Sequence, residues 1–141
     1  MALYYRADLR NYADASYPGV VKILSVRELA EYYSNNRSKY QFNVGYYSET
    51  SMADEVFSDN SGYDDEFFKK NFLLFIILGE GSGSIRHKVG SVSPENGLLK
   101  IDIIRTMPEI GTMDMAQWHI VLALDRSLSG LEAAVKIIDG R

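Results

Sequence analysis

The stretch "FLLFIILGEGSGSIRHKV", residues 72–89, decides the fold because it joins two different strand patterns through a Gly/Ser-rich connection. Residues 72–78 are apolar at every position, which is typical of a central strand that is covered on both faces. Residues 85–92 alternate instead, so that Ile85 and Val89 share one face of a strand. The stretch therefore predicts a fully buried strand, a connection and then a half-buried strand.

The glycines of this connection invite comparison with a phosphate-binding loop, because an apolar strand runs directly into them. The dinucleotide fingerprint G-x-G-x-x-G needs a third glycine where this chain has Ser84. The P-loop needs a lysine that closes the loop, and the first lysine after the glycines is Lys88. Both motifs also lead into a helix N-terminus, whereas strand periodicity follows here. The pattern favours a flexible or bulged connection between strands.

A hairpin is predicted after the second strand, because "PENG", residues 94–97, contains the Asn-Gly pair that a type I′ turn prefers. The returning strand covers residues 98–105. A two-residue turn gives three facing pairs: Val92 with Ile101, Val89 with Ile104, and Lys88 with Arg105. The last pair is unfavourable because like charges oppose each other. The sequence therefore predicts the hairpin but leaves its register open.

A capping-box spacing at Ser25 and Glu28 predicts a helix over residues 25–35. Its apolar residues fall at helical spacing and form one stripe, made of Val26, Leu29, Ala30 and Tyr33. The helix is predicted to end at Asn35-Asn36, since asparagine tolerates the left-handed conformation that commonly ends helices.

A second, shorter helix is predicted over residues 64–70. Asp64 is the expected cap, and the acidic residues that follow it suit the positive end of the helix dipole. Tyr63 is placed to pack against Phe68 as a hydrophobic staple. Between the two helices, residues 38–61 are mostly polar and predict a long excursion with one short element.

Further strands are predicted at residues 20–24, 117–124 and 131–138, so that helices come early and strands come late. This order indicates an α+β fold with a mainly antiparallel sheet, forming a sandwich or half-barrel with helices on one side. We expect one domain over residues 1–141, because a chain of this length can bury a sizeable core. Residues 1–17 are expected to be an irregular or edge-strand segment.

Composition excludes several classes of partner. The net charge is −4 and the 15 Lys and Arg residues are scattered, so that no basic stripe is available to nucleic acid. The longest apolar run, residues 72–78, is far shorter than the ~20 residues of a membrane-spanning helix. The chain has no cysteine, and its two histidines share no metal-ligand spacing. No membrane span, metal or cofactor is therefore expected.

A hydrolase would have to combine Ser82 or Ser84 with His87 or His119. The spacing around both serines differs from the Gly-x-Ser-x-Gly elbow that exposes a nucleophile between a strand and a helix. A single histidine on a strand is more commonly a half-buried, hydrogen-bonded residue. We therefore predict a protein that is not an enzyme, with the Ser/His hydrolase as the enzymatic alternative.

Methionine and tryptophan gather near the end of the chain, in a composition that suits adaptable recognition surfaces. Met107, Met113, Met115 and Trp118 lie within twelve residues of one another. The alternative, which we favour, is that these residues plug one end of the core. Together with the Gly/Ser connection and the histidines, the candidate binding residues are Gly81, Ser82, Ser84, His87, Met107, Met113, Trp118 and His119.

Three segments carry a family resemblance: "FLLFIILGEGSGSIRHKV", "GLLKIDIIRTMPEIGT" and "MAQWHIVLAL". Their order resembles a group of uncharacterised bacterial domains related to the C-terminal domain of PrcB, the namesake of the PrcB-like family. The resemblance covers residues 63–138, with the helix at 25–35 as part of the same unit, and it leaves residues 38–61 unmatched. It implies an exported or lipid-anchored protein that supports a cell-envelope protease. It carries no catalytic or binding residue onto this chain.

These observations predict a non-enzymatic, extracytoplasmic protein-interaction or accessory domain, with a protease or another envelope protein as its partner. The alternative is a small-ligand or peptide-binding module that uses the sheet face and the Gly/Ser loop. No basic-then-apolar export signal opens the printed sequence, so an extracytoplasmic location implies that such a signal was removed.

Overall fold

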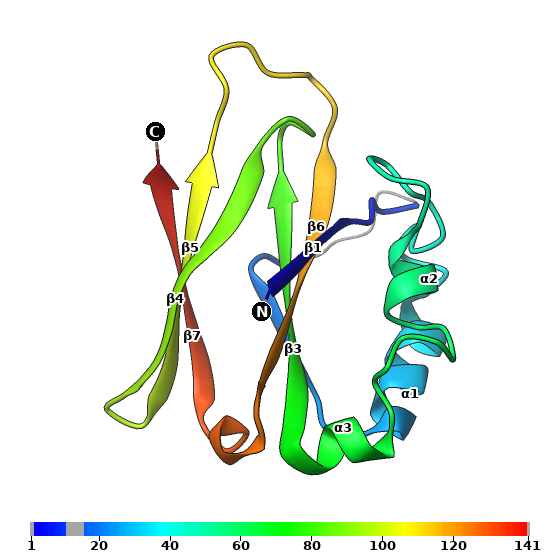
Figure 1. The fold of residues 1–141 in the computed structure, drawn as a ribbon. Coiled ribbons are helices and arrows are strands. Elements are labelled where there is room, and N and C mark those ends of the chain that lie inside the picture. Colours follow the sequence, from blue (N-terminus) through cyan, green and yellow to red (C-terminus); the bar gives the residue numbers. More distant parts are fainter. Residues whose placement is uncertain (1, 11–15, 141) are drawn as a thin grey trace.

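The computed structural model describes residues 2–10 and 16–140, which form two β-sheets and a helical layer (Figure 1). The first sheet has the order β1-β6-β3-β2, and all its neighbouring strands are antiparallel. The second has the order β4-β5-β7, in which β4 and β5 are antiparallel and β5 and β7 are parallel. The bounds are β1 Ala2–Arg6, β2 Gly19–Ile23, β3 Asn71–Glu80, β4 Arg86–Glu95, β5 Leu98–Thr106, β6 Ala116–Asp125 and β7 Glu132–Gly140.

The helices are α1 (Val26–Asn36), α2 (Met52–Glu55) and α3 (Asp65–Lys70), and a short 3-10 turn, η1 (Arg126–Leu128), precedes β7. The helices α1, α2 and α3 pack on the side of the first sheet that faces away from the second sheet (Figure 1). The predicted α+β sandwich with helices on one side is therefore confirmed, and the two sheets do not close into a barrel.

The central strand β3 contributes side chains to two hydrophobic cores because these side chains alternate between its two faces. Leu73, Phe75 and Ile77 pack against the helical layer. The intervening residues Phe72, Leu74, Ile76 and Leu78 pack against the second sheet. The uninterrupted apolar run of this strand is therefore explained by burial on both sides, as predicted.

The β4–β5 hairpin turns at Asn96 and Gly97, which both have positive φ as the predicted turn requires. Val92 pairs with Ile101 as predicted, but the remaining register is shifted by one residue. Observed pairs are Val89 with Ile103, Lys88 with Ile104, and His87 with Arg105. The shift comes from a β-bulge at Gly90, which removes the unfavourable pairing of Lys88 with Arg105.

The helix boundaries agree with prediction at their starts and differ in detail. Ser25 caps α1 and accepts a hydrogen bond from the amide of Glu28, whereas the Glu28 carboxylate accepts from the amide of Leu24 rather than Ser25. The predicted left-handed end is wrong, because the capping residue Arg37 is right-handed with φ −63°. Asn36 instead donates from its side chain to the carbonyl of Tyr32.

The short helix α3 is capped by Asp64 as predicted. The ring of Tyr63 packs on Phe67, with 4.9 Å between the ring centroids, rather than in the predicted staple with Phe68. The excursion before it contains one short helix, α2, and places Tyr40 and Phe42 in the core. None of the helices in the described part of the chain is long and apolar enough to cross a membrane.

At the N-terminus, β1 is an edge strand that pairs with β6. Leu9 makes an isolated bridge to Tyr40, so this segment is tied to the excursion between the helices. The remainder of the predicted irregular segment includes residues 11–15, which lie outside the described residues.

Candidate functional site

The Gly/Ser connection between β3 and β4 lies at one end of the sandwich and is closed by hydrogen bonds to the loop 107–115. The Ser82 and Ser84 hydroxyls are 2.7 Å apart, and Ser82 also lies 3.0 Å from the Thr112 hydroxyl. The Thr112 amide donates to Ser84 Oγ. The two loops therefore form one hydrogen-bonded unit, and both serines are engaged within it.

Arg6 anchors this unit from the end of β1. Its guanidinium pairs with Asp8 and with Asp114, at 2.9 Å in each case. It also donates to the hydroxyl of Tyr47. The hydrogen bonds to Asp8, ahead of those to Tyr47 and Asp114, raise the pKa of Arg6 despite its partial burial. Hydrogen bonds from Thr112, from Arg6 and from the Gly83 amide hold the pKa of Asp114 well below its ordinary value.

Gly83 fits under this anchor because it lacks a side chain. A Cβ at this position would overlap Arg6 and Asp114. The Gly83 carbonyl accepts from Tyr47 and from Arg86, while its amide donates to Asp114. The Gly83 amide, a donor of the kind that a phosphate-binding loop offers to a ligand, is thus taken by Asp114.

An aromatic stack supports the same end of the sandwich. The rings of Tyr47 and Trp118 are nearly parallel, with 5.9 Å between centroids. The Arg86 guanidinium lies 4.6 Å from the Tyr47 ring centroid and 5.5 Å from that of Trp118, which are cation–π distances. Trp118 is only 5% exposed and belongs to the core between the sheets. It plugs the core, as the favoured interpretation of this cluster expects.

The methionines near Trp118 behave differently from it. The loop 107–115 exposes Met107 by 57%, Ile110 by 91%, Met113 by 99% and Met115 by 67%. Asp114 points back to Arg6 from between the last two methionines. The favoured interpretation of this cluster as a plug of the core is therefore confirmed for Trp118 and wrong for Met107, Met113 and Met115, which lie on an exposed loop.

His87 lies between the sheets in a buried charge network. Its Nε2 is 2.7 Å from Glu80 Oε2, and Arg105 donates to the other oxygen of Glu80 at 3.1 Å. Arg105 also pairs with Asp139. Burial lowers the pKa of His87, and this effect outweighs the opposing hydrogen bond to Glu80. Neutral His87 therefore donates from Nε2 to the Glu80 carboxylate at neutral pH.

His119 lies on the opposite face of the first sheet, in the core beneath the helices. Its Nε2 is 2.6 Å from the Tyr32 hydroxyl, and aromatic rings surround it: Tyr32, Tyr40, Phe42 and Phe75. Burial, with a smaller contribution from Lys39, lowers the pKa of His119 to about 3. The two histidines therefore belong to separate cores and do not share a site.

The catalytic and metal-binding arrangements that the sequence raised are not assembled in the part of the chain that the structure describes. There, no hydrogen bond joins Ser82 or Ser84 to a histidine, since His87 pairs with Glu80 and His119 with Tyr32. Within the described ranges 2–10 and 16–140, no group of three or more metal-ligating side chains comes together.

Sequence reasoning missed the charged residues that organise this end of the molecule, namely Arg6, Asp8, Glu80, Arg105 and Asp114. Glu80 alone carried a signal, because an acid that closes an otherwise apolar central strand needs a partner when buried. Comparisons of this chain with protein families, with curated proteins and with solved structures found no match.

Proposed function

We propose that this chain is a protein-interaction module whose contact surface is the loop 107–115. The observation that carries the proposal is the exposure of Met107, Ile110, Met113 and Met115 on this one loop. Large apolar side chains gathered on a surface are characteristic of interaction sites. Methionine suits such a site because its flexible, polarisable side chain adapts to a partner's surface.

The base of the loop supports the same proposal. The hydrogen bonds that Asp114 accepts from Arg6 and from the Gly83 amide hold the loop at its C-terminal end, and the Thr112 amide donates to Ser84. A fixed base lowers the conformational entropy that is lost when a loop binds a partner. We therefore infer that Ile110, Met113 and Met115 are the side chains that enter the partner's surface.

The partner we propose is a protein of the cell envelope, with a protease as the specific candidate, and the module acts there as a non-enzymatic accessory. This part of the proposal rests on the resemblance to PrcB-like domains. On this proposal the chain acts outside the cytoplasm, where an accessory domain and an envelope protease can meet.

The test is site-specific photocrosslinking in the native host, followed by binding measurements with purified proteins. A photocrosslinking amino acid replaces Met113 in one version of the chain. In the control version it replaces Glu95, which ends β4 beside the Asn96-Gly97 turn. We expect position 113 alone to capture a specific envelope protein. The double substitution Ile110→Ser/Met113→Ser should then weaken binding of that purified protein at least about tenfold.

The matched control is Ile138→Ser, which removes an exposed apolar side chain from β7. Equal loss of affinity in the control and in the double variant would contradict the assignment of the surface. Identical capture from positions 113 and 95 would contradict the interaction function, and capture of a cytoplasmic protein that binds through the loop would contradict the envelope location.

A further inference from the structure

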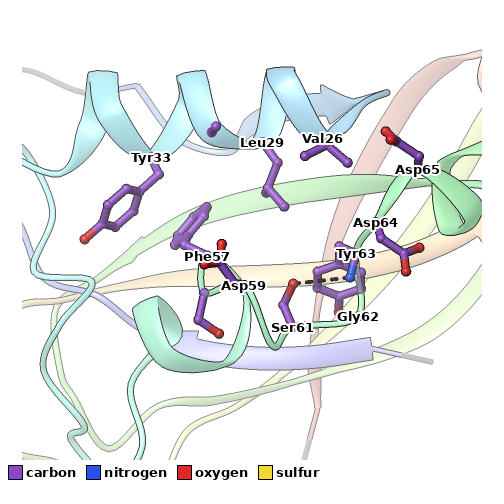
Figure 2. A pocket seen from close by; sticks show the side chains of 12 residues that line it. Val26, Leu29, Tyr33, Phe57, Asp59, Ser61, Gly62, Tyr63, Asp64 and Asp65 are labelled. Atoms are coloured by element: carbon purple, nitrogen blue, oxygen red, sulfur yellow. Dashed lines mark hydrogen bonds between the residues drawn. The ribbon is translucent and has the colours of Figure 1, made fainter.

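A groove of about 370 Å³ lies between α1 and residues 57–65, and none of the residues that line it belongs to the loop 107–115 (Figure 2). Its apolar floor consists of Val26, Leu29, Ala30 and Tyr33 on α1, and Phe57 lines the opposite side. The volume falls within the range of small-ligand pockets in proteins. The groove is therefore large enough for a small molecule with an apolar body.

The floor is formed by the apolar stripe of α1, which the core leaves partly uncovered. Leu29 is buried, but Val26 and Ala30 of the same stripe are exposed. In Figure 2, Val26 and Leu29 project from the helix into the groove, and Phe57 lies opposite them. An amphipathic helix usually buries such a stripe completely, so the groove is a place where apolar surface remains for a ligand.

The rim of the groove carries negative charge without a compensating cation. Asp59, Asp64 and Asp65 line it, and its lining contains neither lysine nor arginine. Asp64 Oδ1 accepts from the amide of Phe67 as the cap of α3. Among the described residues, no hydrogen bond or ion pair engages the carboxylates of Asp59 and Asp65. The rim thus complements a cationic group on a ligand that lies on the apolar floor.

The loop that carries the rim has a defined shape in the unliganded protein. Gly62 has φ +87°, a left-handed conformation that favours glycine. Beside it, the Ser61 hydroxyl accepts from the amide of Tyr63 at 3.2 Å, as the dashed line in Figure 2 shows. A loop held in this way needs little ordering when a ligand binds.

We propose that this groove binds a small amphipathic amine, with its apolar body on the stripe of α1 and its ammonium group at the acidic rim. The site is separate from the loop 107–115 and does not depend on the interaction function proposed for that loop. Apolar contact supplies the attraction for the body, and the two free carboxylates select the positive charge over neutral or negative head groups.

The experiment compares three probes that share a phenyl body and differ in head group: phenethylamine, phenethyl alcohol and 3-phenylpropionate. Each is titrated to about 10 mM into the 15N-labelled protein. We expect saturable amide shifts at Val26, Tyr33, Phe57 and Gly62 with the amine, several-fold weaker binding of the alcohol and no binding of the carboxylate. Raising the salt concentration from about 20 mM to about 500 mM should weaken the binding of the amine and leave the binding of the alcohol unchanged.

Three variants locate the site. Asp59→Asn/Asp65→Asn should lower the affinity for the amine about fivefold or more and leave the affinity for the alcohol unchanged. Ala30→Phe should abolish binding of both, because it fills the groove from an exposed helix position. Glu132→Gln, on β7, removes an exposed acid outside the groove and should change neither. The proposal is overturned if no probe gives saturable shifts at the groove, if amine and alcohol bind equally, or if the double variant and Glu132→Gln weaken the amine equally.

Discussion

Glu80 links the two sheets at the end of the sandwich where the Gly/Ser connection lies. It ends β3 in the first sheet, and it contacts His87 on β4 and Arg105 on β5 in the second. Burying a carboxylate costs desolvation energy, which these two hydrogen bonds offset. The bulge at Gly90 is what brings His87 opposite Arg105, so that both reach the same carboxylate. One acid thus fixes how the sheets meet at this end.

Gly83 and Gly81 provide a matched pair for testing the loop anchor. We expect Gly83→Ala to lower the free energy of unfolding by about 1–3 kcal/mol, because its Cβ would displace the Arg6–Asp114 pair. Gly81→Ala should change it by less than about 0.5 kcal/mol, since a Cβ at this position would meet no atom within 4 Å. Urea denaturation of both variants checks this. A Gly83→Ala variant as stable as Gly81→Ala would show that the anchor contributes nothing.

At the scale of elements, the bulge in β4 lets two valines point to the same face of the strand, although strict alternation would put them on opposite faces. Val89 and Val92 both contact the core between the sheets, although three residues apart they would point to opposite faces of a regular strand. The extra residue Gly90 restores the phase. The odd spacing of these valines was the sequence signal for the bulge, and a register built on an uninterrupted strand overlooked it.

Deleting Gly90 should therefore be tolerated, because the pairs on both sides of the bulge keep their partners. We expect the deletion to lower the free energy of unfolding by no more than about 1 kcal/mol. Val89→Ala should cost about 1 kcal/mol in both the full-length and the deleted chain, since Val89 points into the core in each. Chemical denaturation measures all four proteins. A Val89→Ala substitution without effect in the deleted chain would mean that the strand had turned over.

The apolar stripe of α1 was predicted correctly, but it only partly coincides with the face of the helix that contacts the core. The stripe was identified from spacing alone, and Leu29 does enter the core. Tyr32, outside the stripe, also packs against the core and reaches His119. The face of α1 that contacts the core therefore does not coincide with the apolar stripe. The part of the stripe that the core leaves uncovered, including Val26 and Ala30, lines the groove at residues 57–65.

For the whole molecule, the buried histidines predict a stability that falls in acid. His119 has an ordinary pKa of about 6.5 when unfolded and about 3 when folded. Between these values the unfolded state binds more protons, so stability decreases as pH falls. From pH 7 to pH 5 this residue should account for a loss of about 2 kcal/mol in the free energy of unfolding.

The measurement is urea denaturation at both pH values for the wild type and for His119→Gln. The variant should lose about 2 kcal/mol less than the wild type over this range, whatever its stability at pH 7. His87, whose pKa is also lowered, is retained in both proteins and contributes to both in the same direction. Equal losses in the two proteins would contradict a neutral, buried His119.

Local patterns along the chain were sufficient to predict most of the elements, whereas the type of the short element in residues 38–61 and the strand β1 were left open. The apolar run of β3, the Asn-Gly turn of the hairpin and the caps Ser25 and Asp64 all act between near neighbours, and each is confirmed. The α+β class follows from the order of these elements. The sandwich and its helical layer then follow from the need to cover both faces of one apolar strand.

The sequence by itself therefore determined where most strands and helices form and that β3 is a central strand covered on both faces. Only the tertiary structure decided which charges meet, since Arg6 and Asp114 are 108 positions apart and their pairing leaves no periodic trace in the sequence. The same holds for the exposed loop 107–115 and for the groove beside α1. Periodicity reports which side of an element is apolar, whereas exposure depends on what the remainder of the chain places against it.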